Sequence, residues 1–183
     1  MTPKSEVTMQ LSCPVPASRF DKIQLGHGSG GRMTNELIAE RFMPRVSNDT
    51  LEQLGDAAII TLGRETLAMS TDTFVVKPLE FPGGDIGVLA IHGTVNDISM
   101  MAARPRYITI GFVLEEGLPM ELLDRVVTSM AHAASMAGVT IVAGDTKVVE
   151  RGKADGMFIN TTGIGTLHPA CRPGPTRAAP GDM

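Results

Sequence analysis

Hydrophobic and polar residues alternate along this chain in a way that predicts both strands and helices. Five apolar, β-branched segments bounded by turn residues predict strands: residues 57–62, 67–76, 106–115, 139–149 and 157–165. Three segments with helical spacing predict helices: residues 34–42, with Phe42 inward, 85–103, stopped by Pro105, and 119–137, opened by Pro119 and capped by Gly138. In the second of these, Ile91, Val95, Ile98 and Ala102 form one apolar stripe. Residues 81–84 (FPGG) predict a turn before the second helix. This order of elements predicts an α+β fold, with a mixed sheet and its helices on one face.

The two ends of the chain lack this periodicity. Residues 1–19 contain three prolines, which together with the absence of a pattern predicts a disordered tail. Proline, glycine and alanine dominate from His168 onward, so residues 167–183 are expected to be a linker. One ordered domain is therefore expected over residues 20–166.

Composition narrows the class of protein. The net charge of −4 and the absence of a basic block argue against a nucleic-acid or anionic-membrane surface. No apolar stretch approaches the ~18 residues that a membrane-spanning helix needs. Cys13 and Cys171 both lie in proline-rich ends, which favours a reduced, cytoplasmic protein over a disulfide scaffold.

A glycine-rich segment, Gly28-Ser29-Gly30-Gly31, precedes the first predicted helix. Such a loop can turn backbone N–H groups toward a phosphate, and the helix N-terminus adds a favourable dipole. Together with Gly26 it matches the dinucleotide pattern G-x-G-x-x-G, but no βαβ unit surrounds it. A plain flexible loop is the alternative interpretation.

Four aspartates occupy positions where carboxylates are unusual. Asp72 and Asp145 lie inside strand-like segments, and Asp56 and Asp97 lie at junctions with apolar runs. Scattered carboxylates without a cysteine cluster are typical ligands for Mg²⁺ shared with substrate phosphates. Lys147, two residues after Asp145, would share its strand face and could contact a phosphate. The alternative is an Asp145–Lys147 ion pair, with the other aspartates capping turns.

The predicted helix 85–103 also has a polar stripe. His92 and Asn96 are four residues apart and share a face, and Ser99 continues it. Because Asp97 is adjacent, His92 is a candidate catalytic residue, although a single helical histidine is often structural.

Taken together, these segments resemble the N-terminal half of the HypE family of hydrogenase maturation proteins. The resemblance covers residues 23–165. It is carried by residues 27–32 (HGSGGR), 70–76 (STDTFVV), 81–87 (FPGGDIG), 92–97 (HGTVND), 111–120 (GFVLEEGLPM), 144–149 (GDTKVV) and 158–163 (FINTTG).

The resemblance implies an aminoimidazole ribonucleotide synthetase-like domain that forms a homodimer and binds ATP with Mg²⁺ near the interface. It implies the carbamoyltransferase HypF and the HypC–HypD complex as partners. His92 and Lys147 would be catalytic. Phosphates and nucleotide would be held by Gly28, Ser29, Gly30, Gly31, Asp72, Thr73, Asn96, Asp145, Thr146 and Lys147. Mg²⁺ would be held by Asp56, Asp72, Asp97 and Asp145.

The family's reaction is an ATP-dependent dehydration of a carbamoyl group to a thiocyanate, the source of the cyanide ligands of [NiFe]-hydrogenase iron. That group is carried on a C-terminal cysteine, after a second domain. By this resemblance, Met183 falls about where the family's linker leads into that domain. We therefore expect the ATP-binding half of the enzyme, unable to dehydrate by itself. The alternative is a nucleotide-binding or dimerising module without catalysis.

Overall fold

The computed structural model describes residues 21–167 and 179–181. The predicted tail (residues 1–19) and all of the predicted linker except residues 167 and 179–181 lie outside the described residues. The described residues divide into two units, which fall within residues 1–47 and 48–183. Each is described by itself below.

The first unit is a string of short helical segments. A 3₁₀ turn, η1 (Leu25–Gly28), is followed by α1 (Arg32–Leu37), the π-type segment η2 (Ile38–Phe42) and α2 (Met43–Val46). The helix predicted over 34–42 therefore continues to residue 46. Pro44 falls in the first turn of α2, where a missing N–H is tolerated. No described residue of this unit is buried, and Phe42, which was predicted to face inward, is 53% exposed.

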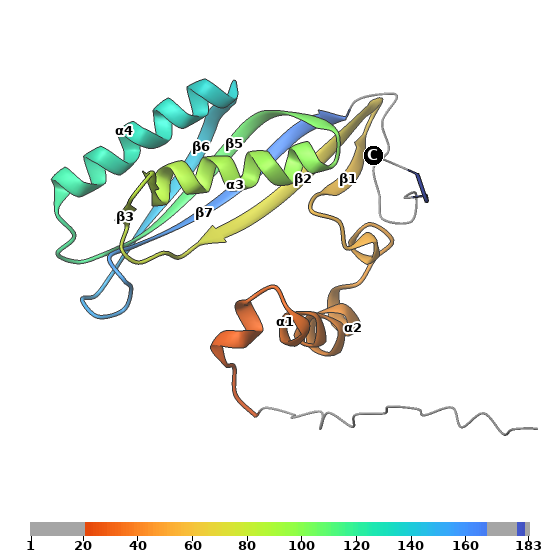
Figure 1. Cartoon of the computed structure of the whole chain (residues 1–183), viewed down its shortest axis with the longest axis horizontal. Coiled ribbons are helices and arrows are strands. Elements are labelled where there is room, and N and C mark those ends of the chain that lie inside the picture. Colours follow the sequence, from red (N-terminus) through yellow and green to blue (C-terminus); the bar gives the residue numbers. More distant parts are fainter. Residues whose placement is uncertain (1–20, 168–178, 182–183) are drawn as a thin grey trace, which may run out of the picture. The chain divides into compact units, whose positions relative to one another are not determined.

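The second unit is built on a five-stranded sheet. After a 3₁₀ turn, η3 (Leu51–Gln53), its strands are β1 (Ala58–Leu62), β2 (Glu65–Phe74), β5 (Ala103–Glu115), β6 (Thr140–Val149) and β7 (Met157–Leu167). The order is β1-β2-β7-β5-β6, so the last strand lies in the middle (Figure 1). Only β5 and β6 pair in parallel. The short strands β3 (Glu80–Phe81) and β4 (Gly84–Asp85) form a separate hairpin at the predicted turn.

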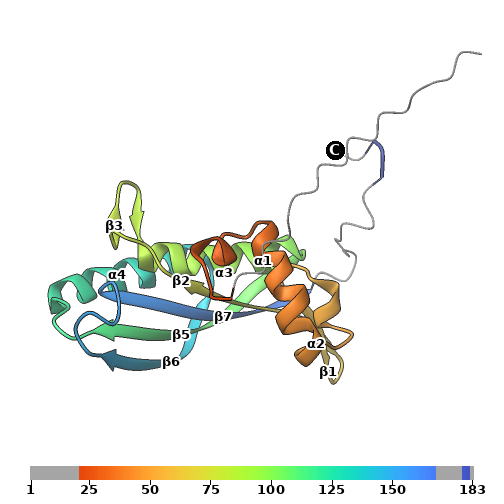
Figure 2. The ribbon, with the colours of Figure 1, turned by 90° about the horizontal axis from the view of Figure 1, so that it is seen from below.

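Two helices, α3 (Ile86–Met100) and α4 (Met120–Ala137), lie on the same side of this sheet (Figure 2). Buried residues of both helices form one core with β5 and β7, including Ile91, Val126, Ile108 and Ile159. The prediction of a mixed sheet with helices on one face is confirmed. Within residues 48–167, no helix covers the opposite face of the sheet.

The boundary between α3 and β5 differs from the sequence prediction. Asp85 caps the start of the helix, where its carboxylate accepts the N–H of Gly87 at 2.7 Å. The helix ends at Met100, and Ala102 takes a left-handed conformation (φ 53°). Pro105 was expected to stop the helix, but it lies inside β5 next to a β-bulge. A bulge accommodates proline because no ladder hydrogen bond is needed there.

The other predicted elements lie close to the observed ones. Helix α4 follows Pro119 and ends at Gly138 in the left-handed conformation (φ 67°), as the capping residues indicated. No helix among the described residues is both long and apolar enough to cross a lipid bilayer.

Candidate functional site

Three of the four predicted aspartates lie near strands β1 and β2 and the adjacent helix α3. Asp72 lies on β2, Asp97 on α3, and Asp56 just before β1. The Ser70 hydroxyl lies 3.1 Å from the backbone oxygen of Asp56 and 3.2 Å from Oδ2 of Asp97, so its one proton can be donated to either acceptor. Ser70 therefore joins the Asp56 segment to α3 through a side chain that is almost fully buried.

The charges of this group act on one another. Partial burial raises the pKa of the Asp97 carboxyl, and the negative charges of Asp72 and Asp56 raise it further. The hydrogen bond from Ser70 opposes this rise in pKa. A cation or a hydrogen-bond donor at this place would relieve the repulsion between the three carboxylates.

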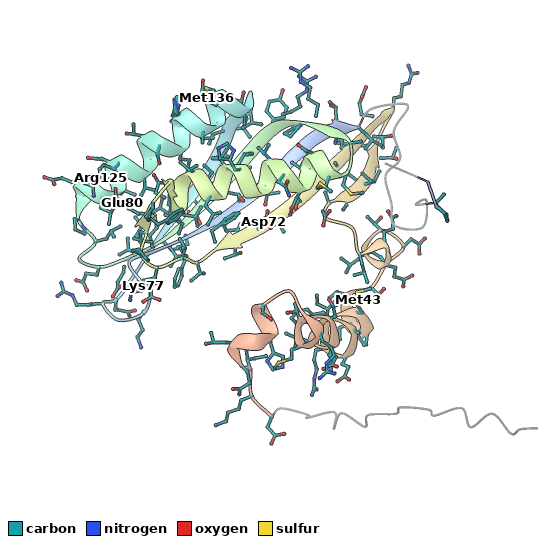
Figure 3. The ribbon with its side chains drawn as sticks, in the orientation of Figure 1. Met43, Asp72, Lys77, Glu80, Arg125 and Met136 are labelled. Carbon is teal, nitrogen blue, oxygen red and sulfur yellow. The ribbon has the colours of Figure 1, made fainter. Side chains whose placement is uncertain are left out.

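Asp72 is held by a second set of buried hydroxyls. Its Oδ2 accepts a hydrogen bond of 3.0 Å from the Thr94 hydroxyl on α3, so its side chain lies between β2 and that helix (Figure 3). Thr94 is in turn hydrogen-bonded to the Thr161 hydroxyl on β7. Both threonines are fully buried.

Asp145 and Lys147 lie elsewhere in the same chain. Strand register places Asp145 in one row with Gly111, Asn160 and Thr73. Three strand spacings of about 4.8 Å separate β6 from β2, so the backbone of Asp145 is about 14 Å from that of Thr73 on β2. Residues alternate between faces, so this row lies on the face opposite α3, whereas Asp72 points toward the helix.

Asp145 pairs with Lys147 on the exposed edge strand. The Lys147 Nζ lies 3.2 Å from Asp145 Oδ2, and both side chains are about 70% exposed, at 71% and 70%. This bond lowers the pKa of Asp145, with help from the backbone N–H of Thr146. The ion pair that the sequence left open as an alternative is therefore formed.

The remaining predicted residues are dispersed. His92 and Asn96 are both exposed on α3, and Asn96 donates a hydrogen bond that lowers the pKa of Asp97. Within the described part of the chain, His92 makes no hydrogen bond or ion pair. Thr73 is exposed and accepts a hydrogen bond of 3.0 Å from Asn160.

The glycine segment belongs to the first unit. Gly30 takes a left-handed conformation (φ 74°) and its N–H donates to Thr34 Oγ1 at 3.0 Å. The Ser29 hydroxyl donates to the Gly26 oxygen at 2.8 Å. A side chain on Gly28 or Gly30 would meet no atom within 4 Å, so the backbone is open on that side.

Magnesium fits this donor set in one particular way. Between residues 21 and 167 and at 179–181, no three His, Cys, Asp or Glu side chains are close enough to enclose a metal ion by themselves. Mg²⁺ commonly takes only one or two protein carboxylates and completes its shell with water and substrate phosphates. Asp72 and Asp97 offer such carboxylate oxygens; Asp145 is too distant to join them in one chain.

Sequence reasoning did not single out the hydroxyls that hold these carboxylates. Ser70, Thr94 and Thr161 are ordinary residues for strands and helices, and only their partners distinguish them. One signal was available, because Thr94 lies three residues after Ile91 and four before Ile98 on the buried side of α3. A polar residue within an apolar stripe indicates a buried hydrogen bond.

Residues 54–167 match the family described as AIR synthase related protein, N-terminal domain. The chain belongs to this family. Carbamoyl dehydratase HypE of Azotobacter vinelandii is 51% identical over 164 residues, which are 90% of this chain and 48% of that protein. The resemblance to HypE seen in the sequence is thereby confirmed. The chain spans about half the length of the curated relatives it matches.

Solved structures of HypE share the fold of this domain family. The HypE chain of a HypE–HypF complex is 51% identical, with a TM-score of 0.74 over 79% of this chain and 47% of that one. HypE in complex with ATP is 56% identical, with a TM-score of 0.62 over 87% of this chain and 48% of that one. The aminoimidazole ribonucleotide synthetase-like fold is thus shown.

Proposed function

We propose that this chain is the ATP-binding half of a HypE-type carbamoyl dehydratase, which acts in hydrogenase maturation. The observation that carries the proposal is the group of Asp56, Asp72 and Asp97 around Ser70, in a chain 56% identical to a HypE that binds ATP. Carboxylates that repel one another are a good environment for Mg²⁺ bound with phosphates.

The residues would act as follows. Asp72 and Asp97 would hold Mg²⁺, and Lys147 would contact phosphates. The glycine segment of the first unit is proposed separately as a phosphate-binding loop. When ATP is bound, one of its phosphoryl groups would pass to the carbamoyl oxygen, which would then leave as inorganic phosphate, with ADP as the other product. His92, exposed and without a partner among the described residues, accepts the proton of the carbamoyl amide. Dehydration also needs the carbamoyl-bearing cysteine, which belongs to the half of HypE that this chain does not span.

A homodimer explains the position of Asp145 and Lys147. They lie on the helix-free face of the sheet, where Met69 is 39% exposed and Tyr107 is 52% exposed. Pairing of this face with that of a second copy would bury these apolar side chains. In such a dimer the Asp145–Lys147 pair of each subunit would lie at the interface, beside the sheet of the other copy. HypF is proposed as a partner because a relative forms a complex with it. The HypC–HypD complex is proposed as a partner from the family resemblance. A cytoplasmic location is proposed from the two cysteines in proline-rich ends.

Calorimetric titration of the chain with ATP, with and without Mg²⁺, tests this function. We expect binding that requires Mg²⁺ and that is lost in Asp145→Asn. Asp124→Asn, a change at another exposed aspartate (on α4), is the matched control and should bind as the wild type does. Absence of Mg²⁺-dependent binding by the wild-type chain would refute the proposal.

A nucleotide-binding and dimerising module without catalysis is the second candidate. It is favoured by the isolation of His92, which no hydrogen bond among the described residues orients toward the aspartates. Release of phosphate from ATP with a carbamoylated partner distinguishes the two. We expect no turnover by the 183 residues alone, and turnover once a polypeptide that carries the second half of HypE is added. Binding without turnover in that mixture would favour the module.

A further inference from the structure

Two buried hydroxyls interrupt the apolar contact between α3 and the sheet. Thr94 and Thr161 are both inaccessible to solvent, and Ile91, Ile98 and Ile159 around them are equally buried. Valine has nearly the same shape as threonine and would pack here without needing a partner. A buried hydroxyl is costly unless it is hydrogen-bonded, so its presence here calls for a reason.

The direction of the hydrogen bonds supplies that reason. An ionised carboxylate can only accept, so the single Thr94 proton is donated to Asp72 Oδ2. The bond between the two threonines must then be donated by Thr161 to Thr94. The result is a one-way chain from β7 through α3 to the carboxylate on β2, in which each buried hydroxyl donates to the next group.

The packing also fixes the orientation of Thr94. A Cβ on Gly163 would lie only 2.6 Å from Thr94 Cγ2, so the missing side chain at Gly163 leaves room for this methyl group. With the methyl group held against Gly163, the hydroxyl of Thr94 is directed toward Asp72. Among the described residues, no other hydrogen bond is made by the Asp72 carboxylate, which leaves its Oδ1 available to a ligand.

We propose that Thr94 and Thr161 are positioning residues that hold the Asp72 carboxylate, through Oδ2, in the orientation in which Oδ1 contacts the bound magnesium–nucleotide. This inference rests on the proposed function, because it assigns Asp72 a ligand. Groups that orient the direct ligands of a metal typically contribute 10- to 100-fold to affinity, so the effect of removing them is measurable.

The test compares Thr94→Val with Thr94→Ser, which keeps the hydroxyl and loses the methyl group. Affinity for ATP is measured by calorimetry at saturating Mg²⁺. We expect Thr94→Val to weaken binding about tenfold and Thr94→Ser to stay within about twofold of the wild type. Thr161→Val keeps the direct bond to Asp72, so a measurable loss that is smaller than that of Thr94→Val is expected. Thr128→Val, whose exposed hydroxyl donates to a backbone oxygen of α4, is the control.

Asp72→Asn separates positioning from packing. If Thr94 acts through the carboxylate, Thr94→Val causes no further loss of affinity in the Asp72→Asn background. The same pair in a urea-unfolding cycle should show coupling in the absence of ligand, and this detects the contact independently of binding. If Thr94→Val does not fold, Thr161→Val and Thr94→Ser still test the positioning role. Weaker binding in Thr161→Val with near wild-type binding in Thr94→Ser supports this role, and wild-type affinity in Thr161→Val overturns it.

The possible failures are distinguishable. Wild-type binding together with unchanged affinity in Thr94→Val overturns the positioning role and leaves the proposed function intact. Equal losses from Thr94→Val in the wild-type and Asp72→Asn backgrounds also overturn it, because the effect would then be one of packing. If the wild type binds no magnesium–ATP, the proposed function and the positioning role fall together.

Discussion

Gly163 sets the distance between α3 and the centre of the sheet, and replacing it by alanine tests this packing. The added Cβ would lie 2.5 Å from Ile98 Cδ1 and 2.6 Å from Thr94 Cγ2. Carbon atoms in ordinary contact are about 3.5–4.0 Å apart, so both side chains must leave their rotamers or the helix must move by about 1 Å.

The size of the effect follows from two opposing contributions. Leaving a favoured rotamer costs about 0.5–1.5 kcal/mol for each of the two side chains, or about 1–3 kcal/mol together. Alanine regains about 0.5–1 kcal/mol relative to glycine, because the unfolded chain is less flexible. The two contributions leave a loss of about 0–2.5 kcal/mol, so Gly163→Ala should lower the free energy of unfolding by about 1 kcal/mol.

Equilibrium urea unfolding followed by far-UV circular dichroism measures this change. Gly111→Ala is the matched control, since its Cβ would lie 3.9 Å from Asn160 on the other face of the sheet. We expect it to be neutral or slightly stabilising. Adding Ile98→Val to Gly163→Ala removes the nearest clashing atom, so the double variant should lose less than the sum of the single losses. Equal stabilities of the two alanine variants, or strict additivity with Ile98→Val, would refute the reasoning.

Two further predictions concern pH. The N–H groups of Gly152 and Gly156 donate to the Glu115 carboxylate and lower its pKa below the ordinary value of 4.5. Ionised Glu115 therefore stabilises the folded state fully above pH 4.5, and this stabilisation is lost as the pH falls through the lowered pKa of the folded state. The free energy of unfolding of Glu115→Gln should depend less on pH in that range than that of the wild type or of the control Glu116→Gln. Amide hydrogen exchange at Gly152 and Gly156 should also be faster in Glu115→Gln. A pH dependence equal to that of the wild type would contradict this prediction. The pKa of Asp97 is raised, so its ionised form is penalised in the folded state: Asp97→Asn should be more stable at pH 7.5, by less than about 1 kcal/mol. That advantage should disappear in urea titrations as the pH approaches 3.8, and a gain that persists there would contradict the assignment.

The sequence predicted the elements well where periodicity and capping residues agreed. Helix α4 is an example, because the apolar spacing and Gly138 indicate the same end. The boundary near Pro105 was wrong because proline normally ends a helix and here sits at a bulge within β5. A bulge depends on strand pairing, which local residues do not encode.

The candidate site was predictable in its residue types but not in its grouping. Carboxylates within strands pointed to Asp72 and Asp145, yet strand order places β6 at the far edge from β2, so the two do not meet in one chain. Ser70 lies in residues 70–76, one of the segments that carry the resemblance, but nothing in that segment indicates a hydrogen bond to a helix. Its role depends on Asp97, which lies 27 residues further along the chain.

The central position of β7 has a consequence for the synthesis of this protein. Leu67 on β2 pairs with Thr166, and Ala103 at the start of β5 pairs with Leu167, so both halves of the sheet require the strand made last. Before then, β2 and β5 have no common neighbour and expose apolar edges to other chains. Contacts between such distant residues form slowly. The growing chain should therefore depend on chaperones until residue 167 has left the ribosome, and deletions within β7 should reduce soluble yield more than deletions within β1.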